Sequence, residues 1–508
     1  MTIQTMIEPN PPLVLPCPPD PEMTATHGET TAAAVGPAPK PEDEGIQIEQ
    51  EIFAALGEPF LINETNGKVE LNQRAVAKTF THARVMQYDA ALKQFCRYDA
   101  ATGRWVGELA ERTHEAMAQH LNRLGEQTGH QAFVHRQKEG TINSLVKFAR
   151  SNDVKPTRMD TDWLFPVANG VLDFHDGPPV LRPHSREYPF RHCSGVHYDP
   201  QARCERFRAE LLDPALEADD RQLLQTLLGG LLLGGNRAQK ILLIRGTSGG
   251  GKSTLVSVIE KVLGEHRVAY LRAKNLNGRF ETAGFLGRTV LVGKDVPGDT
   301  LSEKGARLLK SLTGGDLLEG EIKYQQHRPQ MKGCFHVIIV SNNHLRIALD
   351  GDELAWERRL VTVEFNREVP LKPIVDLADE LVSAEGSGIL NWLIEGALRY
   401  HAELESVGRI TMAEAQRQRV RNLLYNSDSV RAFVEQHLSP TPGHDVSSQE
   451  LLTAYVARCQ QNGWQPVSGK AFLQAVADAL ASRQNIHQRH DIMRDGGPVR
   501  GFKGVALS

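Results

Sequence analysis

An eight-residue segment near the middle of the chain constrains the fold more than any other feature of the sequence. Residues 246–253 read GTSGGGKS and match the pattern G-x-x-x-x-G-K-[ST] at every fixed position. The apolar run 241–244 predicts a buried strand before this segment, and apolar residues recur at helical spacing from 255 to 263 after it. A strand, a glycine-rich loop and a helix in this order predict a phosphate-binding loop within an α/β domain.

The residue types of this loop suit a nucleoside triphosphate. Glycines let successive backbone N–H groups approach the phosphates, because no Cβ stands in the way. Lys252 is expected to reach the β- and γ-phosphates of ATP, and Ser253 offers a hydroxyl to Mg²⁺. Thr254 could also contact the nucleotide, and the alternative is that it only caps the helix. The expected ATP-binding residues are Gly246, Thr247, Ser248, Gly249, Gly250, Gly251, Lys252, Ser253 and Thr254.

Two later apolar runs, 289–292 and 336–340, predict further strands, and their alternation with helices predicts a mostly parallel sheet. Asp295 follows the first run and could hold Mg²⁺ and orient water, although a strand-end turn would also explain it. Asn342 follows the second run, where a carboxamide could sense the γ-phosphate; ordinary turn chemistry is the alternative. These two residues therefore extend the predicted ATP site.

An arginine pair, Arg358 and Arg359, precedes one more predicted strand. An arginine supplied across a subunit boundary could neutralise charge in the transition state of phosphoryl transfer. The alternative is a surface ion pair with Glu357 or Glu353.

The ordered set of motifs resembles the superfamily-three helicases and, more closely, the phage/plasmid and poxvirus-type primase-helicase family. The motifs are GTSGGGKST, LVGKD, KSLTGGD, VIIVSNN and WERRL, preceded by NGVLD at 169–173 and YDP at 198–200. The resemblance covers roughly residues 85–508 and implies an AAA+ type P-loop ATPase. It implies that Lys252 and Ser253 form the Walker A pair, that Asp295 is the Walker B acid, where the family often has Glu, and that Asn342 is the polar sensor. It also implies that Arg358 or Arg359 is the arginine finger.

Two basic segments are candidates for DNA binding. The resemblance places a pore hairpin for single-stranded DNA within residues 321–333, and the C-terminal segment from 466 onward holds six Lys and Arg against three Asp, a local charge of +3. A solvated loop and a protein-docking module are the respective alternatives. The candidate residues are Lys323, Tyr324, His327, Arg328 and Lys332 in the first segment and Arg489, Arg494, Arg500 and Lys503 in the second.

Composition divides the chain into four parts. Residues 1–45 hold ten of the 27 prolines and no apolar period, which predicts a disordered tail. A mixed α/β, helix-rich domain is expected at 46–204, the ATPase at 205–424 and a winged-helix module at 425–508. The winged-helix interpretation depends on a capping box at Ser447-x-x-Glu450, a second helix after Ser468 and a hairpin around residues 495–497.

The expected N-terminal domain contains several turn signals. Residues 94–106 suggest two strands around a turn at 99–103, and Asn169-Gly170 and Asp176-Gly177 are hairpin signals. Helical apolar spacing recurs at 111–124 and 141–149.

Overall composition limits the classes of function. The chain has 58 Lys and Arg against 62 Asp and Glu, a net charge of -4, so nucleic-acid binding must arise from local patches. Six scattered cysteines without a CxxC pair favour a cytoplasmic protein. The most apolar run, 223–235, is too short to span a membrane and predicts a buried helix. The spacing of His192, Cys193, His197 and Cys204 matches no standard zinc site, and residues 46–190 lack the carboxylate cluster of primase chemistry.

The sequence therefore favours an ATP-dependent DNA helicase or replication ATPase of a phage or mobile element. The expected assembly is a hexameric ring on single-stranded DNA, with duplex DNA held by the C-terminal module and a separate primase or polymerase as a further partner. One alternative is an ATP-switched origin-binding or regulatory protein without unwinding. Another is an assembly scaffold driven by its ATPase.

Overall fold

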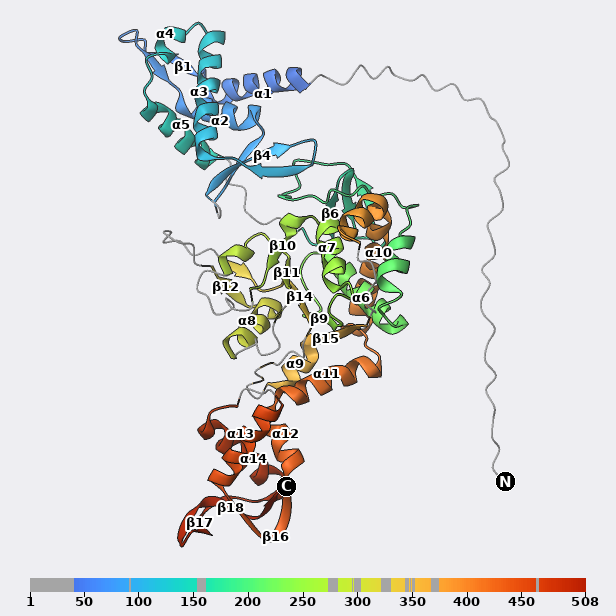
Figure 1. The fold of residues 1–508 in the computed structure, drawn as a ribbon. Coiled ribbons are helices and arrows are strands. Elements are labelled where there is room, and N and C mark those ends of the chain that lie inside the picture. The colour runs from blue at the N-terminus through green and yellow to red at the C-terminus, as the bar shows by residue number, and fades with distance from the viewer. Residues whose placement is uncertain are drawn as a thin grey trace, which may run out of the picture.

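The structure is a computed structural model of the 508-residue chain. It describes residues 41–90, 93–152, 161–272, 282–294, 296, 303–320, 330–342, 347, 349, 352–366, 374–462 and 466–508. Figure 1 shows three units that follow one another in space in the order of the sequence: an N-terminal domain, a central α/β domain and a C-terminal module. The predicted tail lies outside the described residues except at its end, where helix α1 (Pro41–Leu56) begins.

The N-terminal domain packs helices against a small antiparallel sheet. Its elements after α1 are β1 (Phe60–Ile62), β2 (Val69–Leu71), α2 (Gln73–Ala83), β3 (Met86–Asp89), β4 (Gln94–Asp99), β5 (Arg104–Gly107), α3 (Ala110–Gln127), α4 (Gln131–Val134) and α5 (Glu139–Asn152). The predicted turn between β4 and β5 is confirmed, since Asp99 pairs with Arg104. The Asp99 carboxylate accepts hydrogen bonds from the Thr102 hydroxyl (2.6 Å) and the Ala101 N–H (3.3 Å), and Gly103 takes a φ of +64°.

A three-stranded meander links this domain to the central one. It comprises β6 (Leu164–Val167), β7 (Gly170–Asp173) and β8 (Val180–Arg182), so both predicted hairpins are present. Gly170 is required because a Cβ on it would lie 2.4 Å from the Arg182 carbonyl oxygen. The Asn169 carboxamide donates to the Tyr198 carbonyl (2.9 Å) and accepts from the Tyr198 N–H (2.8 Å). These bonds join the NGVLD and YDP segments, which are far apart in the sequence.

A five-stranded parallel sheet forms the centre of the molecule, as the sequence predicts. Its strands are β9 (Ile241–Gly246), β10 (Val268–Tyr270), β11 (Val290–Gly293), β14 (His336–Ser341) and β15 (Leu360–Phe365), in the spatial order β10-β11-β14-β9-β15. Strand β9 is central and buried on both faces. Its alternating residues divide between two cores: Leu242 and Ile244 face one, while Ile241 and Leu243 face the other.

Helices cover both faces of the sheet. The first core includes residues of η1 (Phe207–Leu212), α6 (Ala218–Gly229), η2 (Gly230–Leu232), α7 (Lys252–Leu263) and α10 (Leu377–Val407). The second includes residues of α8 (Glu303–Gly314), α9 (Glu353–Arg359) and α11 (Glu414–Ser427). Short elements also accompany the sheet: η3 (Glu265–Arg267), η5 (Thr282–Phe285), β12 (Leu317–Glu319) and β13 (Gln330–Lys332).

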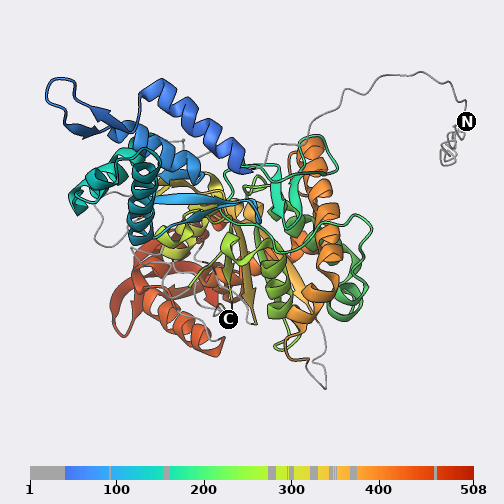
Figure 2. The same ribbon diagram turned by 90° about the horizontal axis from the view of Figure 1, so that it is seen from above.

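The apolar run 223–235 forms α6 and η2 and is buried against α10, so the prediction of a buried helix is confirmed. The two helices approach closely because glycines lie at the contact. A Cβ on Gly229 would lie 2.1 Å from the Ala397 nitrogen, and one on Gly396 would lie 2.0 Å from the Gln225 carbonyl oxygen. The orange ribbon of α10 runs beside the green helices in Figure 2. None of the helices within the described residues combines the length and apolarity needed to cross a membrane.

The C-terminal module has the order helix, strand, helix, helix, strand, strand. Its elements are α12 (Ser429–His437), β16 (Leu438–Ser447), α13 (Ser448–Gln461), α14 (Gly469–Gln484), β17 (Gln488–Arg494) and β18 (Gly497–Leu507), with the sheet order β16-β18-β17. The predicted capping box is confirmed: the Ser447 N–H donates to the Glu450 carboxylate (2.7 Å), and the Glu450 N–H donates to the Ser447 hydroxyl (3.2 Å). Asp495 and Gly496 both have positive φ, which suits a two-residue hairpin turn.

Candidate functional site

The predicted phosphate-binding loop connects the carboxyl end of β9 to the first turn of α7. Gly249 and Gly251 have φ of +77° and +101°, a region that side chains disfavour. Gly246 lies beside β15, where a Cβ would come within 2.1 Å of the Phe365 carbonyl oxygen. Thr247, Ser248 and Gly249 are exposed and Gly250 is buried. The loop therefore depends on its glycines for conformation as well as for access to a ligand.

Lys252 is the first residue of α7 and is 4% exposed. Its Nζ donates to the carbonyls of Gly246 (2.9 Å) and Thr247 (2.6 Å), so the ammonium group lies against the loop. Ser253 is exposed and Thr254 half-buried in the same first helical turn. The first N–H groups of a helix have no acceptor within the helix, and here they lie beside this cation, an arrangement that suits an anion.

Asn342 lies at the same edge of the sheet as the loop. It follows Ser341, which pairs with Arg245 of β9, and its side chain is exposed. The chain after β11 closes over this edge, since the Val296 N–H donates to the Val340 carbonyl (3.1 Å) and the Ser341 hydroxyl donates to the Val296 carbonyl (2.8 Å). The carboxyl ends of parallel strands are where α/β folds bind ligands.

Lys294 contacts the helix that follows the loop, and the sequence analysis did not identify it as a candidate. Its Nζ lies 2.7 Å from the buried carboxylate of Glu260 on α7 and 5.1 Å from the centre of the Tyr270 ring. These contacts tie the end of β11 to the helix that follows the loop. The only sequence signal was its place next to the predicted Walker B acid.

Several predicted site residues lie outside the described residues. These are Asp295, Lys323, Tyr324, His327 and Arg328. Lys332, the remaining residue of the predicted pore segment, ends β13 and is exposed.

The two arginines lie at the opposite edge of the sheet from the loop. They immediately precede Leu360, which pairs with Ile241 at the start of β9, whereas Gly246 at its end pairs with Phe365. The six residues of β9 span about 20 Å. This separation is far beyond the reach of an arginine side chain, so neither arginine can contact phosphates held by its own loop.

Burial distinguishes Arg358 from Arg359. Arg358 is exposed, whereas Arg359 is 9% exposed and donates from Nη1 to the Ala355 carbonyl (3.1 Å). Burial, followed by repulsion from Arg358, lowers the pKa of Arg359. Glu353 and Glu357, the two glutamates considered as ion-pair partners of the arginines, pair with other residues. Glu353 pairs with Arg431 (2.7 Å) and Glu357 with Arg421 (3.8 Å).

Lys240 supports the end of the arginine helix, a contact that the sequence did not indicate. Its Nζ donates to the main-chain carbonyl of Arg358 (2.6 Å), one of the terminal acceptors of α9. Burial lowers the pKa of Lys240 to about 8, and the cations of Arg409 and Arg358 act in the same direction. Lys240, Arg358 and Arg409 therefore form a basic cluster at the amino edge of the sheet.

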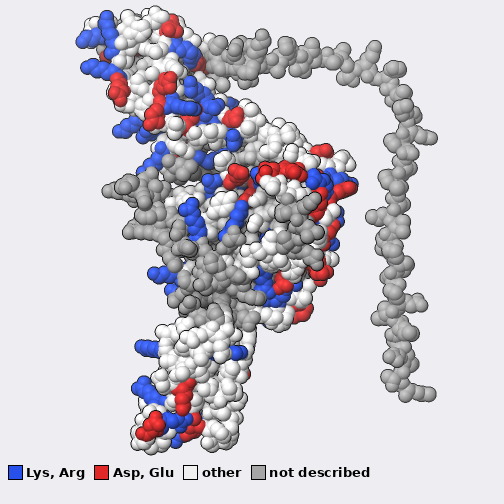
Figure 3. Space-filling model, in the orientation of Figure 1, with Lys and Arg blue, Asp and Glu red and all other residues white. Residues whose placement is uncertain are grey.

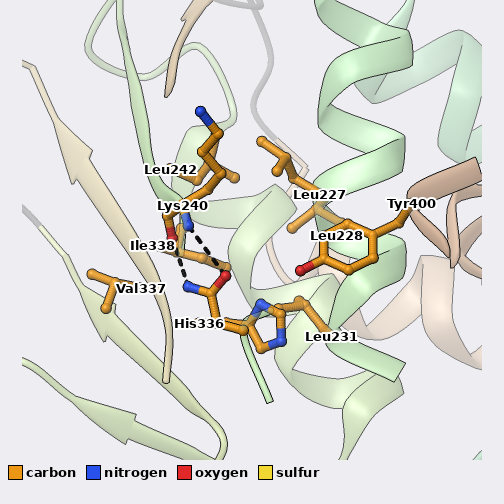
Figure 4. A pocket seen from close by; sticks show the side chains of 10 residues that line it. Leu227, Leu228, Leu231, Lys240, Leu242, His336, Val337, Ile338 and Tyr400 are labelled. Atoms are coloured by element: carbon orange, nitrogen blue, oxygen red, sulfur yellow. Dashed lines mark hydrogen bonds between the residues drawn. The ribbon is translucent and has the colours of Figure 1, made fainter. Parts of the chain in front are cut away.

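A small cavity is lined in part by Lys240, as Figure 4 shows. Its volume of about 20 Å³ has room for a water molecule and excludes a nucleotide. Burial lowers the pKa of His336 in its wall to about 4, so the neutral ring donates from Nε2 to the Gly234 carbonyl (3.1 Å). The cavity is lined by Leu227, Leu228, Leu231, Asn236, Lys240, Leu242, His336, Val337, Ile338 and Tyr400.

The basic residues of the C-terminal hairpin have acidic or polar partners. Arg489 and Lys503 pair with Asp491 at 3.0 and 3.1 Å, and Arg500 donates to His490 (3.1 Å). Arg494 pairs with Glu450 (2.8 Å) and donates to the Asp445 carbonyl (2.6 Å). Residues 425–508 contain eight Lys and Arg against seven Asp and Glu, so the predicted +3 falls to +1 over the module. Red and blue side chains accordingly mix at its lower tip in Figure 3.

Within the described residues, no group of three or more His, Cys, Asp or Glu side chains is arranged to hold a metal ion. Of the four residues His192, Cys193, His197 and Cys204, Cys204 is buried in the first core.

Two protein-family models match parts of the chain. Residues 73–213 match a family described as D5 N terminal like, and residues 244–359 match a family of unknown function (DUF5906). The first region runs from α2 to just beyond η1, and the second from β9 through α9. The first match supports a relationship to the phage and viral primase-helicases that the motifs resemble.

No match was found among curated proteins. Among solved structures, the apo structure of the NrS-1 C terminal region (305-718) aligns over 83% of this chain and 96% of that chain, at 13% identity and a TM-score of 0.43. Two A form apo structures of the same region align over 82% of this chain and 96% of theirs, at 12% identity and TM-scores of 0.43 and 0.42.

Proposed function

We propose that this protein is an ATP-dependent DNA helicase of phage or mobile-element replication that acts as an oligomeric ring. The observation that carries the proposal is the placement of Lys252 and Arg358 at opposite edges of one parallel sheet. A head-to-tail assembly would bring the Arg358 edge of one subunit to the loop edge of the next, and each ATP site would then contain residues of two subunits. Six subunits are expected from the resemblance.

The residues at the loop edge would bind and orient ATP. The N–H groups of the loop and the first turn of α7 would cradle the phosphates, and Lys252 would turn from the loop carbonyls to the β- and γ-phosphates. The exposed Ser253 hydroxyl fits a Mg²⁺ ligand, with Asp295 as the proposed acidic partner. Bound Mg²⁺ would neutralise phosphate charge. Asn342 would hold the attacking water at the γ-phosphate.

Arg358 is proposed as the arginine finger, and Arg359 as a structural residue of the same helix. Arg358 presents its guanidinium to solvent at the amino edge, whereas Arg359 is buried within its own subunit. Since Lys240 binds the Arg358 carbonyl, it would set the direction of the finger. A finger of this kind contributes roughly 10³- to 10⁵-fold in rate.

Nucleotide hydrolysis would move the pore segment along single-stranded DNA. Lys323, Tyr324, His327, Arg328 and Lys332 are the proposed contacts, because positive charge beside an aromatic ring suits a single strand. The C-terminal module is proposed to be a winged helix, and its proposed duplex contacts are Arg489, Arg494, Arg500 and Lys503.

A specific observation favours protein docking as a second role for the C-terminal module. Lys470 in the first turn of α14 is exposed, but the exposed residues from Ala471 to Ser482 are neutral or acidic, and Gln474 donates to Asp478 there (3.0 Å). The helix that enters a DNA groove normally presents donors and cations. A primase or polymerase with a complementary surface would be a suitable partner.

The test combines ATP hydrolysis with strand displacement on forked DNA. Wild type should hydrolyse ATP faster with single-stranded DNA and separate the strands, while Lys252→Ala should do neither. The control Lys68→Ala changes an exposed lysine of the N-terminal domain and should behave as wild type. Hydrolysis without strand separation on forks of either polarity would contradict the helicase proposal and favour an ATP-switched DNA-binding protein.

A further inference from the structure

Charge is distributed unevenly within the N-terminal domain. Residues 41–72 contain one Lys against eight Asp and Glu, whereas residues 73–152 contain twelve Lys and Arg against seven Asp and Glu, a local charge of +5. Helix α1, which carries much of the acidic segment, and α5 lie on opposite sides of α2 in Figure 1, and Figure 2 again places them apart. The basic side chains of this domain are visible at the top of Figure 3. Helix α5 therefore belongs to the basic segment of this domain and lies apart from the acidic helix α1.

Helix α5 presents a wide polar and basic face to solvent. Leu145, Val146 and Ala149 are buried in the domain core, which turns the opposite face outward. The exposed face contains Gly140, Asn143, Ser144, Lys147, Phe148, Arg150 and Ser151. The one acidic residue of helix α5, Glu139, is in its first turn, so the rest of the helix carries no negative charge. We name this exposed face, together with Tyr88, the α5 surface.

The cations of the α5 surface make no ion pair within the described residues. Lys147 has no hydrogen-bond or ionic partner there, and Arg150 lies 5.6 Å from the centre of the Tyr88 ring on β3. The nearby acid Asp89 is 8% exposed and already pairs with Arg191. Both positive charges are therefore available to a ligand without breaking an existing pair.

Aromatic rings border the cations on both sides. At 100° per residue, Phe148 and Arg150 lie on either side of Lys147, separated by about 160° around the helix. Phe148 is 42% exposed, which is unusual for an aromatic side chain on an otherwise polar helix face. Tyr88 lies beneath Arg150 at the other border. The residues between the borders are small, so a flat ligand can lie close to the helix.

We propose that the α5 surface binds single-stranded DNA, with Lys147 and Arg150 on the phosphates and Phe148 stacking on a base. Positive charge beside exposed aromatic rings is the combination that binds single strands without sequence preference. This inference rests on the proposed function, because the strand concerned is the one that the ATPase would follow. It adds a contact site outside the pore segment and the C-terminal module.

The test measures binding separately from hydrolysis. Full-length protein carrying Lys252→Ala is titrated against a fluorescently labelled oligothymidine, and the same titration is repeated with Phe148→Ala or with Lys147→Gln and Arg150→Gln together. Phe148→Ala should weaken binding by about tenfold. The double variant should weaken it further and reduce the slope of log affinity against log salt by about 1.4, since each phosphate contact contributes about 0.7.

Matched controls keep the result interpretable. Leu109→Ala removes an apolar side chain that is 64% exposed, and Lys68→Gln removes an exposed cation from the acidic side of the domain; both should bind as the parent does. Phe148→Trp should retain affinity, and the fluorescence of the introduced indole should be quenched when a base stacks on it.

Two results would overturn the inference: parent-like affinity and salt slope in the α5 variants, or unquenched indole fluorescence in a bound complex of Phe148→Trp. A change in oligomeric state alone would instead identify the acidic side of a second copy as the occupant. If the wild-type protein fails to separate the strands of forked DNA, the proposed function is contradicted, but the binding result for the α5 surface still holds.

Discussion

The separation of Lys252 from Arg358 makes a quantitative prediction about mixed oligomers. Lys252→Ala removes the cation of the phosphate loop, and Arg358→Ala removes the arginine at the other edge of the sheet. Because about 20 Å of strand β9 separates the two edges, each variant should damage a different half of a shared site. Each variant alone should lose roughly 10³-fold or more of its ATPase rate.

Mixing the two variants in equal amounts should restore activity. Half of the subunits would keep an intact loop, and half of their neighbours would keep Arg358. About one quarter of the sites in a randomly mixed head-to-tail assembly would therefore be complete. The ATPase rate should rise from roughly one thousandth to about one quarter of the wild-type rate.

The assay is steady-state phosphate release after subunit exchange, with fluorescence transfer between labelled subunits reporting the exchange. A mixture of Lys252→Ala with Ser253→Ala is the matched control, because both changes damage the same half-site and should not complement. If exchange is complete and the first mixture stays as inactive as either variant alone, the assignment of Arg358 to the neighbouring site is wrong.

Three further predictions follow from local contacts. Lys240→Met removes the hydrogen bond to the Arg358 carbonyl at the end of α9, so in ATPase kinetics it should lower kcat more than it raises KM. Lys240→Arg should retain more of the activity. The positioning role would be contradicted if both variants changed thermal stability equally and neither changed kcat. Gly396→Ala should destabilise the central domain by about 3 kcal/mol in denaturant unfolding, because its Cβ would lie 2.0 Å from the Gln225 carbonyl oxygen. Gly140→Ala on α5 is the control: its Cβ would have no neighbour within 4 Å, so it should not destabilise the protein. Arg494, with the Ser447 N–H, holds the pKa of Glu450 at about 2, below its ordinary 4.5, so its stabilisation is present above about pH 4.5 and is lost as pH falls toward 2. Glu450→Gln should therefore reduce the loss of stability that the C-terminal module shows when the pH falls from 4.5 to 2. The difference in unfolding free energy should be less than about 1 kcal/mol, since the pair is exposed. If wild type and variant lose stability equally over this pH range, the ion pair does not contribute to stability.

The predictions made from sequence succeeded where a short segment contains its own physical cause. The strand before the phosphate loop, the capping box at Ser447 and the turn after Asp99 all depend on neighbours within a few residues. The first four residues of β9, 241–244, could be recognised because strand residues that are buried on both faces of a sheet are apolar. The buried helix at 223–235 followed for the same reason, although its close approach to α10 depended on Gly396, which lies far away in the sequence.

The charge patterns were harder to interpret where the partner of a charged residue is distant in sequence. Six basic residues near the C-terminus suggested a DNA-binding surface, and this stays a prediction. The sequence did not reveal that Arg494 pairs with Glu450, 44 residues earlier, or that Asp491 pairs with both Arg489 and Lys503. The sequence did not predict that Lys147 and Phe148 of α5 share an exposed surface, since a helical pattern does not show that a phenylalanine is exposed. Burial depends on which faces the other helices cover, and that is decided by packing.

The sequence by itself determined a glycine-rich loop between a buried strand and a helix, because glycine and apolar spacing act locally, and it predicted that this loop binds phosphate. It also placed an arginine pair before a strand, but it could not say which of Arg358 and Arg359 is exposed or how far the pair lies from the loop. Only the tertiary structure decided these points, because strand register sets the distance between the loop and the arginines, and helix packing buries one arginine and exposes the other.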